Sequence, residues 1–315
     1  MSFDDDFKEL QPTLFALAYR MLGSVGEAED IVQEAFIRGR RAVVDGADID
    51  SPKAYLSAVV TRLSIDHLRS ARARREVYFG EWLPEPILTD DDPGLDPAAH
   101  AEQADSLSLA FLVLLEQLNP VERAAFLLHD VFGYGYGEIA VTMGKSEDNC
   151  RQLVSRARRH IDDEKPRFEA SRQERQRLAE RFFAAVGDGS VEALAEMLAA
   201  DVVVYGDGGG KGPSWPRPIV GRERVSRLFA GLGADMKDVG VRMELHEVNG
   251  QPGALVLDPD DRIVNVFSLD IADGVVQTIR SVINPDKLGH LGPLADVRGL
   301  LRRASQARLS LHDRS

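Results

Sequence analysis

Residues 138–161, EIAVTMGKSEDNCRQLVSRARRHI, carry the clearest local fold signal in the sequence. A short helix is predicted up to Gly144, where glycine permits the positive φ of a tight turn. Ser146 is a favourable N-cap for a second helix that starts immediately after it. This spacing predicts a helix-turn-helix.

The second helix of this motif separates into two faces when its residues are placed at about 100° intervals. Its apolar face holds Cys150, Leu153, Val154, Ala157 and Ile161. Its opposite face holds Asp148, Arg151, Gln152, Ser155, Arg156 and Arg159. A basic face opposite a core face is what a helix in the major groove of DNA requires, and a plain solvated basic face is the alternative.

The side-chain chemistry of the polar face separates two kinds of DNA contact. Arginine can fork onto guanine and glutamine onto adenine, so Arg151 and Gln152 are predicted to read bases. Arg156, Arg158 and Arg159 are predicted to bind phosphates. Cys150, the single cysteine, is predicted to be a buried packing residue, and one cysteine excludes an internal disulfide.

Charge is unevenly distributed along the 315 residues, whose net charge is −13. Residues 62–75 hold five arginines against Asp66, and residues 151–160 hold four arginines and no acid. Residues 76–105 hold nine acids and no Lys or Arg. This pattern indicates a chain that touches DNA at two places and avoids it between them, although solvated helix faces would give the same charges.

The composition and the N-terminus indicate a cytoplasmic protein. Hydrophobic residues make up 44% and charged residues 28% of the sequence, which is ordinary for a globular protein. No apolar run reaches the ~18 residues needed to span a bilayer, so no membrane partner is expected. The acidic start, MSFDDDFKEL, does not match a secretory signal.

Periodicity and turn residues divide the chain into helical and mixed parts. Residues 7–75 and 101–165 are predicted to be helical, and residues 80–100, with four prolines, to form a linker. Beyond residue 170 the pattern becomes α+β. Helices are expected at about 172–186, 190–199 and 221–231, and strands at 202–205, 239–248, 253–257, 262–270 and 274–283.

The helix predicted at 25–38 has an unusual exposed face. Ala28, Ile31, Val32, Ala35 and Phe36 share its apolar face. The opposite face carries Asp30, Gln33 and Glu34 around Ile37. An isoleucine surrounded by acids and an amide suggests a protein-contact surface, although single exposed apolar residues are common.

Three segments together resemble the extracytoplasmic-function (ECF) sigma factors of RNA polymerase. Residues 15–38 are similar to the segment that grips the polymerase clamp, residues 61–75 to the −10-binding helix, and residues 117–159 to the −35-binding domain. The resemblance implies core RNA polymerase (the β′ clamp) and promoter DNA as partners.

The resemblance also assigns roles to individual residues. Those implied to bind core polymerase are Asp30, Gln33, Glu34 and Ile37. Those implied to bind the −10 element are Arg62, Asp66, His67, Arg69, Arg72, Arg74 and Arg75, with His67 expected to be exposed. Those implied to bind the −35 element are Ser146, Asp148, Arg151, Gln152, Ser155, Arg156, Arg158 and Arg159.

Three further motifs are similar to those of the sigma-J-like subgroup, in which a SnoaL-like α+β cone follows the two helical domains and tunes sigma activity. They are Trp82-Leu83-Pro84-Glu85-Pro86, Asp207-Gly208-Gly209-Gly210-Lys211 and Asn284-Pro285-Asp286-Lys287-Leu288, which are expected to have regulatory or interdomain roles. The implied domains are 1–78, a linker at 79–104, 105–166, the cone at 170–290, and a tail at 291–315.

These motifs also have simpler interpretations. The first suits a rigid proline linker with one buried tryptophan. The glycines of the second suit either a tight turn or a backbone-amide anion nest. Lys211 is expected to pair with a linker acid or with Asp286, which would make it a domain latch.

No enzyme activity, cofactor or metal is expected. The candidate acids and bases of the cone are Asp207, His246, Asp258, Asp260, Asp261 and Asp270, and their spacing pairs no base with an orienting partner. A small-molecule ligand of the cone is left open. Two alternatives remain: a stand-alone helix-turn-helix regulator that senses such a ligand, and a cone enzyme fused to a DNA-binding module.

Overall fold

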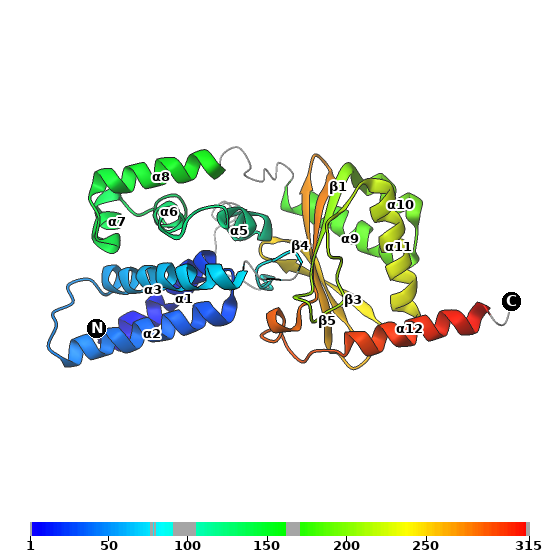
Figure 1. Cartoon of the computed structure of the whole chain (residues 1–315), viewed down its shortest axis with the longest axis horizontal. Helices are drawn as coiled ribbons and strands as arrows, with labels where there is room; N and C mark the ends of the chain where they lie inside the picture. The colour runs from blue at the N-terminus through cyan, green and yellow to red at the C-terminus, as the bar shows by residue number, and fades with distance from the viewer. Residues whose placement is uncertain (1, 76–77, 79, 91–104, 162–170, 313–315) are drawn as a thin grey trace. The chain divides into compact units, whose positions relative to one another are not determined.

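The computed structural model describes residues 2–75, 78, 80–90, 105–161 and 171–312 (Figure 1). The chain divides into two compact units. One holds residues 1–77 and 111–165, and the other holds residues 78–110 and 166–315. None of the described helices is long and apolar enough to cross a membrane.

The helical unit begins with α1 (Phe3–Leu22), α2 (Val25–Val44) and α3 (Pro52–Arg75). Ser24 accepts a hydrogen bond from the Glu27 amide at 3.3 Å, and Ser51 accepts one from the Ala54 amide at 3.2 Å, so a serine caps the start of α2 and of α3. The three helices share a core in which buried side chains recur at helical spacing. Its members include Leu14, Leu17, Met21, Ile31, Val32, Leu56 and Val60.

The same unit continues with α5 (Leu109–Leu115), whose first two residues fall in the other unit, and then with α6 (Pro120–Phe126), the π-helical turn η1 (Leu127–Val131), α7 (Tyr136–Met143) and α8 (Glu147–Ile161). Gly144 ends α7 with φ 63°, and Ser146 accepts from the Asn149 amide at 3.3 Å. Cys150, Leu153 and Val154 are buried, as the two-face analysis predicts. The helix-turn-helix is therefore confirmed in its local geometry.

Within this unit, α6 and the loop before α7 contact the first three helices through buried polar groups. The hydroxyls of Ser57 on α3 and Tyr134 lie 2.8 Å apart and are buried. Arg123 donates from one guanidinium nitrogen to the Met21 carbonyl and to Glu116, both at 2.7 Å. Burial lowers the pKa of Arg123 to about 9, so the group stays cationic at neutral pH and needs these acceptors.

The second unit is built on a six-stranded sheet in the order β2-β1-β6-β5-β4-β3. Its strands are β1 (Leu198–Asp207), β2 (Ile219–Val220), β3 (Arg242–Val248), β4 (Gln251–Leu257), β5 (Ile263–Ala272) and β6 (Val275–Val282). β1 runs parallel to β6, and all other neighbours are antiparallel. All five predicted strands are present, and β2 is an additional short one.

Two of the hairpins explain part of this topology. Asn249-Gly250 joins β3 to β4 and Asp273-Gly274 joins β5 to β6, with φ of 53° and 71° in each pair. Two consecutive positive φ values are typical of the type I′ turn, which matches the right-handed twist of paired strands.

Helices α9 (Arg172–Asp188), α10 (Val191–Met197) and α11 (Arg222–Asp238) lie along one side of the sheet (Figure 1). Phe182, Phe229 and Phe267 meet in the core between these layers. The short turn η2 (Pro285–Lys287) follows β6. The stretch 291–315, predicted only as a tail, contains α12 (Val297–His312), whose Leu300 joins the same core.

Replacing Ser57 by alanine is expected to destabilise the helical unit by about 1–3 kcal/mol, because the buried Tyr134 hydroxyl would lose its partner. Ser64 offers a matched control. It is equally buried on α3, and its hydroxyl has no hydrogen-bond partner among the described residues. Ser64→Ala is expected to be neutral or stabilising. Urea unfolding of both variants followed by circular dichroism measures the difference, and equal losses would contradict it.

Candidate functional site

All of the α8 and α8-cap residues predicted to contact DNA lie on the exposed face of the helix-turn-helix. The exposed set comprises Ser146, Asp148, Arg151, Gln152, Ser155, Arg156, Arg158 and Arg159. The opposite face is closed against α6 by Leu153 and Val154, which contact Ala125. The helix therefore exposes its basic face while its opposite face packs on α6.

Several of these arginines already have protein partners. Arg151 pairs with Glu147 at 3.1 Å, and its guanidinium lies 4.6 Å from the centre of the Tyr136 ring. Arg158 makes a forked contact with the Asp130 carboxylate, a pair that helical periodicity does not predict because Asp130 lies 28 residues away. Arg156 lies 3.6 Å from Glu122. These contacts orient the guanidinium groups while they remain at the surface.

The candidate polymerase-contact residues of α2 also lie at the surface. Asp30, Gln33 and Ile37 are exposed, with Ile37 at 36%, and Glu34 pairs with Arg38 at 2.7 Å. Beside them a hollow of about 550 Å³ opens between α1 and α2, lined by Phe15, Gln33 and Phe36 among others. Helical periodicity does not predict this hollow, because it places Phe36 on the core face of the helix.

Only some of the basic residues of α3 have side chains that the structure describes. Arg62, Asp66 and Arg69 are exposed, and Arg69 lies 3.5 Å from Asp66. His67 is half-buried and its Nε2 lies 3.0 Å from Glu27 on α2, which corrects the expectation that it is exposed. The side chains of Arg72, Arg74 and Arg75 lie outside the described residues.

The three subgroup motifs converge on one buried carboxylate in the second unit. Asp207, at the end of β1, has 0% exposure. It accepts hydrogen bonds from the Tyr78 hydroxyl at 2.5 Å, the Leu83 amide at 2.8 Å, and the Gly209 amide at 3.1 Å. Lys287 Nζ lies 2.7 Å from the same carboxylate. The linker, the glycine loop and η2 thus share one ion pair, which we call the Asp207 latch.

Lys287 and Asn284 also contact the linker directly, at Tyr78, Trp82 and Leu83. The Lys287 ammonium group donates to the Leu83 carbonyl and lies 4.4 Å from the Trp82 ring centre and 4.9 Å from that of Tyr78. Asn284 donates to the Tyr78 hydroxyl at 2.8 Å. Burial and the adjacent carboxylate raise the pKa of Tyr78 well above its usual value, so its hydroxyl remains a donor.

Lys211 lies outside this buried cluster. It pairs with Asp286 at 2.5 Å, one of the two partners predicted, but both side chains are 60% exposed. An exposed pair of this kind contributes little to stability. The lysine of the latch is therefore Lys287 and not Lys211. The sequence singles out Lys287 only as one residue of the Asn284–Leu288 motif.

The rest of the described linker runs along β3, the edge strand of the sheet, and forms backbone hydrogen bonds with its C-terminal end. Ile87 and Asn249 exchange hydrogen bonds of 2.9 and 2.8 Å, and the Thr89 amide donates to the Glu247 carbonyl at 2.8 Å. Asp90 contacts His246, whose orientation the alternation of β3 left open. β3 is an edge strand, and a linker paired with it satisfies backbone groups that would otherwise face solvent.

Several candidate acids and bases of the cone make structural contacts, although Asp270 Oδ1 is buried without a hydrogen-bond partner among the described residues. Asp207 and His246 face the linker, Asp270 forms a buried pair with Arg280, and Asp258 caps the turn at Asp260 and Arg262. Within the described ranges, no group of three or more His, Cys, Asp or Glu side chains is arranged to hold a metal ion.

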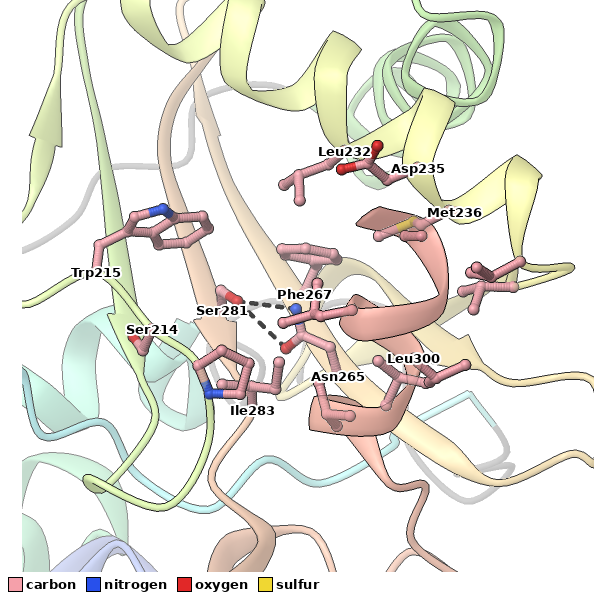
Figure 2. Close-up of a pocket in the computed structure, with 17 residues that line it drawn as sticks. Ser214, Trp215, Leu232, Asp235, Met236, Asn265, Phe267, Ser281, Ile283 and Leu300 are labelled. Atoms are coloured by element: carbon pink, nitrogen blue, oxygen red, sulfur yellow. Dashed lines mark hydrogen bonds between the residues drawn. The ribbon is translucent and has the colours of Figure 1, made fainter. Parts of the chain in front are cut away.

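The cone also encloses a cavity of about 300 Å³, which lies between α11, strands β5 and β6, and α12 (Figure 2). Its lining is mainly apolar and includes Trp215 and Phe267. On its floor, Asn265 Nδ2 donates to Ser281 Oγ at 2.9 Å. Among the described residues that line the cavity, Asp235 is the only charged one, so these side chains offer a single carboxylate and no basic group.

Comparison with known proteins matches these parts one by one. The Sigma-70 region 2 model matches residues 7–74, the Sigma-70, region 4 model residues 108–161, and the SnoaL-like domain model residues 179–269. The ECF RNA polymerase sigma factor SigJ of Mycobacterium tuberculosis is 36% identical over 295 residues, which cover 90% of this chain and 92% of that protein.

A second relative and a solved structure give the same match. The probable ECF RNA polymerase sigma factor SigI of the same organism is 34% identical over 283 residues, covering 88% of this chain and 92% of its own. The crystal structure of Mycobacterium tuberculosis SigJ superposes with a TM-score of 0.71 at 34% identity, over 92% of this chain and 99% of that one.

Lys287→Met is expected to destabilise the second unit by about 3–5 kcal/mol, because it leaves the Asp207 carboxylate buried without its cation. Lys211→Met removes the exposed lysine of the neighbouring pair and is expected to cost about 1 kcal/mol or less. Urea unfolding followed by tryptophan fluorescence compares the two. A loss for Lys211→Met as large as that for Lys287→Met would refute the assignment of the latch.

Proposed function

Because the chain belongs to the ECF family of RNA polymerase sigma factors, we propose that it binds core RNA polymerase and directs it to promoters through α3 and α8. The observation that carries this proposal is the ordered pair of sigma regions 2 and 4, each of which presents basic residues on an exposed helix face. Such an activity places the protein in the cytoplasm with the polymerase.

We assign the core-polymerase contact to Asp30, Gln33, Glu34 and Ile37 of α2. An exposed isoleucine among acidic and amide groups suits a partner surface that is apolar at its centre and basic at its rim. The hollow beside Gln33 would accept a side chain of the partner. The β′ clamp is the partner that the family resemblance implies.

We assign −10 recognition to α3. Opened promoter DNA is a single strand, which needs a cationic surface along its backbone and platforms for its unstacked bases. Arg62 and Arg69 supply exposed charge. His67, held by Glu27, is better suited to positioning α3 against α2 than to a direct base contact. Arg72, Arg74 and Arg75 remain proposed contacts from the sequence.

We assign −35 recognition to α8. Arg151 and Gln152 lie in its first half, where a recognition helix meets base edges, and Arg156 and Arg159 lie further along, where phosphates are contacted. Arg158 is fixed by Asp130, so we assign it a phosphate contact that first requires exchange of this partner.

The contacts between the two DNA-binding parts imply a closed state of the helical unit. The −35 and −10 elements are named by positions about 25 base pairs apart, which is roughly 85 Å of duplex. α3 and the loop before α7 are held together by the buried contact between Ser57 and Tyr134. The two parts must therefore separate before both elements are engaged, and polymerase binding is the event we propose to separate them.

We propose that the SnoaL-like domain regulates this sigma factor by holding its linker. Residues 82–89 lie in the linker between the two sigma regions and are held on the Asp207 latch and the β3 edge. When polymerase separates the two regions, as proposed above, these residues have to leave both places. Releasing them costs the buried contacts of Asp207 and Lys287. The domain is proposed to be non-catalytic, since its candidate acids and bases have structural partners.

Transcription in vitro with core polymerase and the purified chain tests the main proposal. A promoter-specific transcript is expected without any other sigma factor. A stand-alone regulator would give none, and that result would contradict the proposal. Removing residues 170–315 is expected to change the transcript level without abolishing it, because both sigma regions lie before residue 170. An unchanged level would remove the regulatory role.

Base reading by α8 has its own test. Arg151→Ala or Gln152→Ala is expected to weaken binding to the −35 element by ~1–3 kcal/mol, with the loss confined to one base position. Arg159→Ala is the control from the phosphate-contacting half and should weaken binding to all sequences alike. Binding to single-base variants of the −35 element measures both. A uniform loss for Arg151 and Gln152 would show that they contact only phosphate.

A further inference from the structure

The first turn of α7 carries an aromatic ring that contacts the proposed base-reading arginine of α8. The Arg151 guanidinium lies over the Tyr136 ring, 4.6 Å from its centre. Tyr136 is the first residue of α7 and is half-buried. An arginine over an aromatic face gains cation–π attraction, and the contact favours the rotamers that maintain it. The ring therefore restricts where the guanidinium of Arg151 can point.

Neighbouring contacts hold the Tyr136 ring itself in place. The ring of His129, in η1, packs against it with the two centroids 4.3 Å apart. His129 is oriented in turn by its Nδ1, which lies 3.0 Å from the Tyr134 carbonyl oxygen. The start of α7 is fixed by Glu138, whose carboxylate accepts from the Gly135 amide at 2.8 Å. His129, Tyr136 and Arg151 thus form a continuous stack between η1 and α8.

A carboxylate is the second group that holds the guanidinium. Glu147 accepts a hydrogen bond from Arg151 at 3.1 Å. Gly137 leaves room for this carboxylate beside α7, because a Cβ there would lie 3.3 Å from Glu147 Oε1. Both side chains of the pair are more than half exposed, so the pair adds little to stability. Its effect is to limit the directions in which Arg151 extends.

The held arginine keeps the groups that base reading needs. Stacking on Tyr136 uses the face of the guanidinium, whereas hydrogen bonds to guanine O6 and N7 lie in its plane. The bond to Glu147 uses one of the five N–H groups of the side chain. The Arg151 side chain is 55% exposed. Arg151 can therefore stay on the ring while its edge contacts a base.

Holding Arg151 before DNA arrives affects how well it recognises a base. A rotamer-rich side chain that is mobile in the free protein loses several-fold in affinity when the complex immobilises it. A side chain already held by its neighbours loses less. A forked contact also forms both of its bonds only in one geometry, so a correctly placed fork distinguishes guanine from other bases more sharply.

We propose that Tyr136 is a positioning residue for base recognition, whose ring, held by His129, presets the Arg151 guanidinium to read one guanine of the −35 element. The inference rests on the proposed function of α8 and adds to it the base that Arg151 reads and the residue that sets its accuracy. If Tyr136 acted only through packing, its loss would weaken binding to every sequence alike.

The test uses the full chain bound to core RNA polymerase and a −35 element selected from random-sequence promoter DNA with the wild-type holoenzyme. Discrimination at each position is the Kd for a duplex with one base pair replaced, divided by the Kd for the selected duplex. Arg151→Ala first identifies the position that Arg151 reads, as the one where discrimination falls most. A guanine is expected there, and any other base would overturn the base assignment.

Tyr136→Leu removes the ring and keeps an apolar side chain. It is expected to lower discrimination at the Arg151 position about three- to tenfold and to leave other positions within about twofold. Tyr136→Phe keeps the ring face and should retain wild-type discrimination. Tyr136→Met is a second ring-free variant, with the same expectation as Tyr136→Leu. In the Arg151→Ala background, Tyr136→Leu should change discrimination no further.

Met143→Ala is the matched control for packing. Met143 and Tyr136 are both half-buried residues of α7 that pack against the same small core of Ala125, Leu153 and Val154, but the guanidinium lies over Tyr136. Met143→Ala should therefore weaken binding to all sequences alike. Wild-type discrimination in both ring-free variants, equal losses for Tyr136→Phe and Tyr136→Leu, or the same position-specific loss in Met143→Ala would overturn the positioning role.

Failure of the proposed function would give a different result. If Arg151→Ala kept wild-type discrimination at every position, or if the selection enriched no −35 sequence, base reading by Arg151 and this inference would both be wrong. A position-specific loss in Arg151→Ala that neither ring-free variant of Tyr136 shares would remove the positioning role alone.

Discussion

The buried ion pair between Asp207 and Lys287 is the interaction on which the arrangement of the second unit depends. A carboxylate with no exposure is stable only when donors surround it. Tyr78 and Leu83 of the linker, Gly209 of the glycine loop and Lys287 of η2 supply them. The linker is therefore bound as a structural part of the cone. Releasing Tyr78 and Leu83 alone would cost free energy, because the buried Asp207 carboxylate would lose two of its hydrogen-bond donors.

On the proposed function, the closed helical unit and the docked linker restrict the same activity at two points. The contacts of Arg123 and Ser57 hold sigma region 4 against region 2, which is the closed state that we propose polymerase opens. The latch holds the segment that joins the two regions. On the proposed function, a sigma factor built in this way carries its own restraint within one chain, and we propose that polymerase binding releases it.

Local features of the fold could be predicted from the sequence, and long-range partners could not. Gly144, Ser146 and the two faces of α8 follow from turn chemistry and helical periodicity, which act over a few residues. The pairing of Asp207 with Lys287 depends on β1 running parallel to β6. This places Asp207 opposite Val282, so the C-terminal ends of both strands lie at the same end of the sheet. Lys211 is closer in sequence but sits on the exposed side of the loop. Likewise, Asp130 and Glu27 orient Arg158 and His67 from helices that periodicity cannot bring together.

The central claim is that the linker of the free chain is held on the cone by the Asp207 latch. Hydrogen exchange measured amide by amide tests it directly, with Asp207→Asn compared with wild type. The account predicts that the Leu83 amide, which donates to Asp207, exchanges slowly in wild type and much faster in the variant, while amides in the core of β5 stay protected in both. Exchange of Leu83 in wild type at the rate of an unstructured peptide would contradict it.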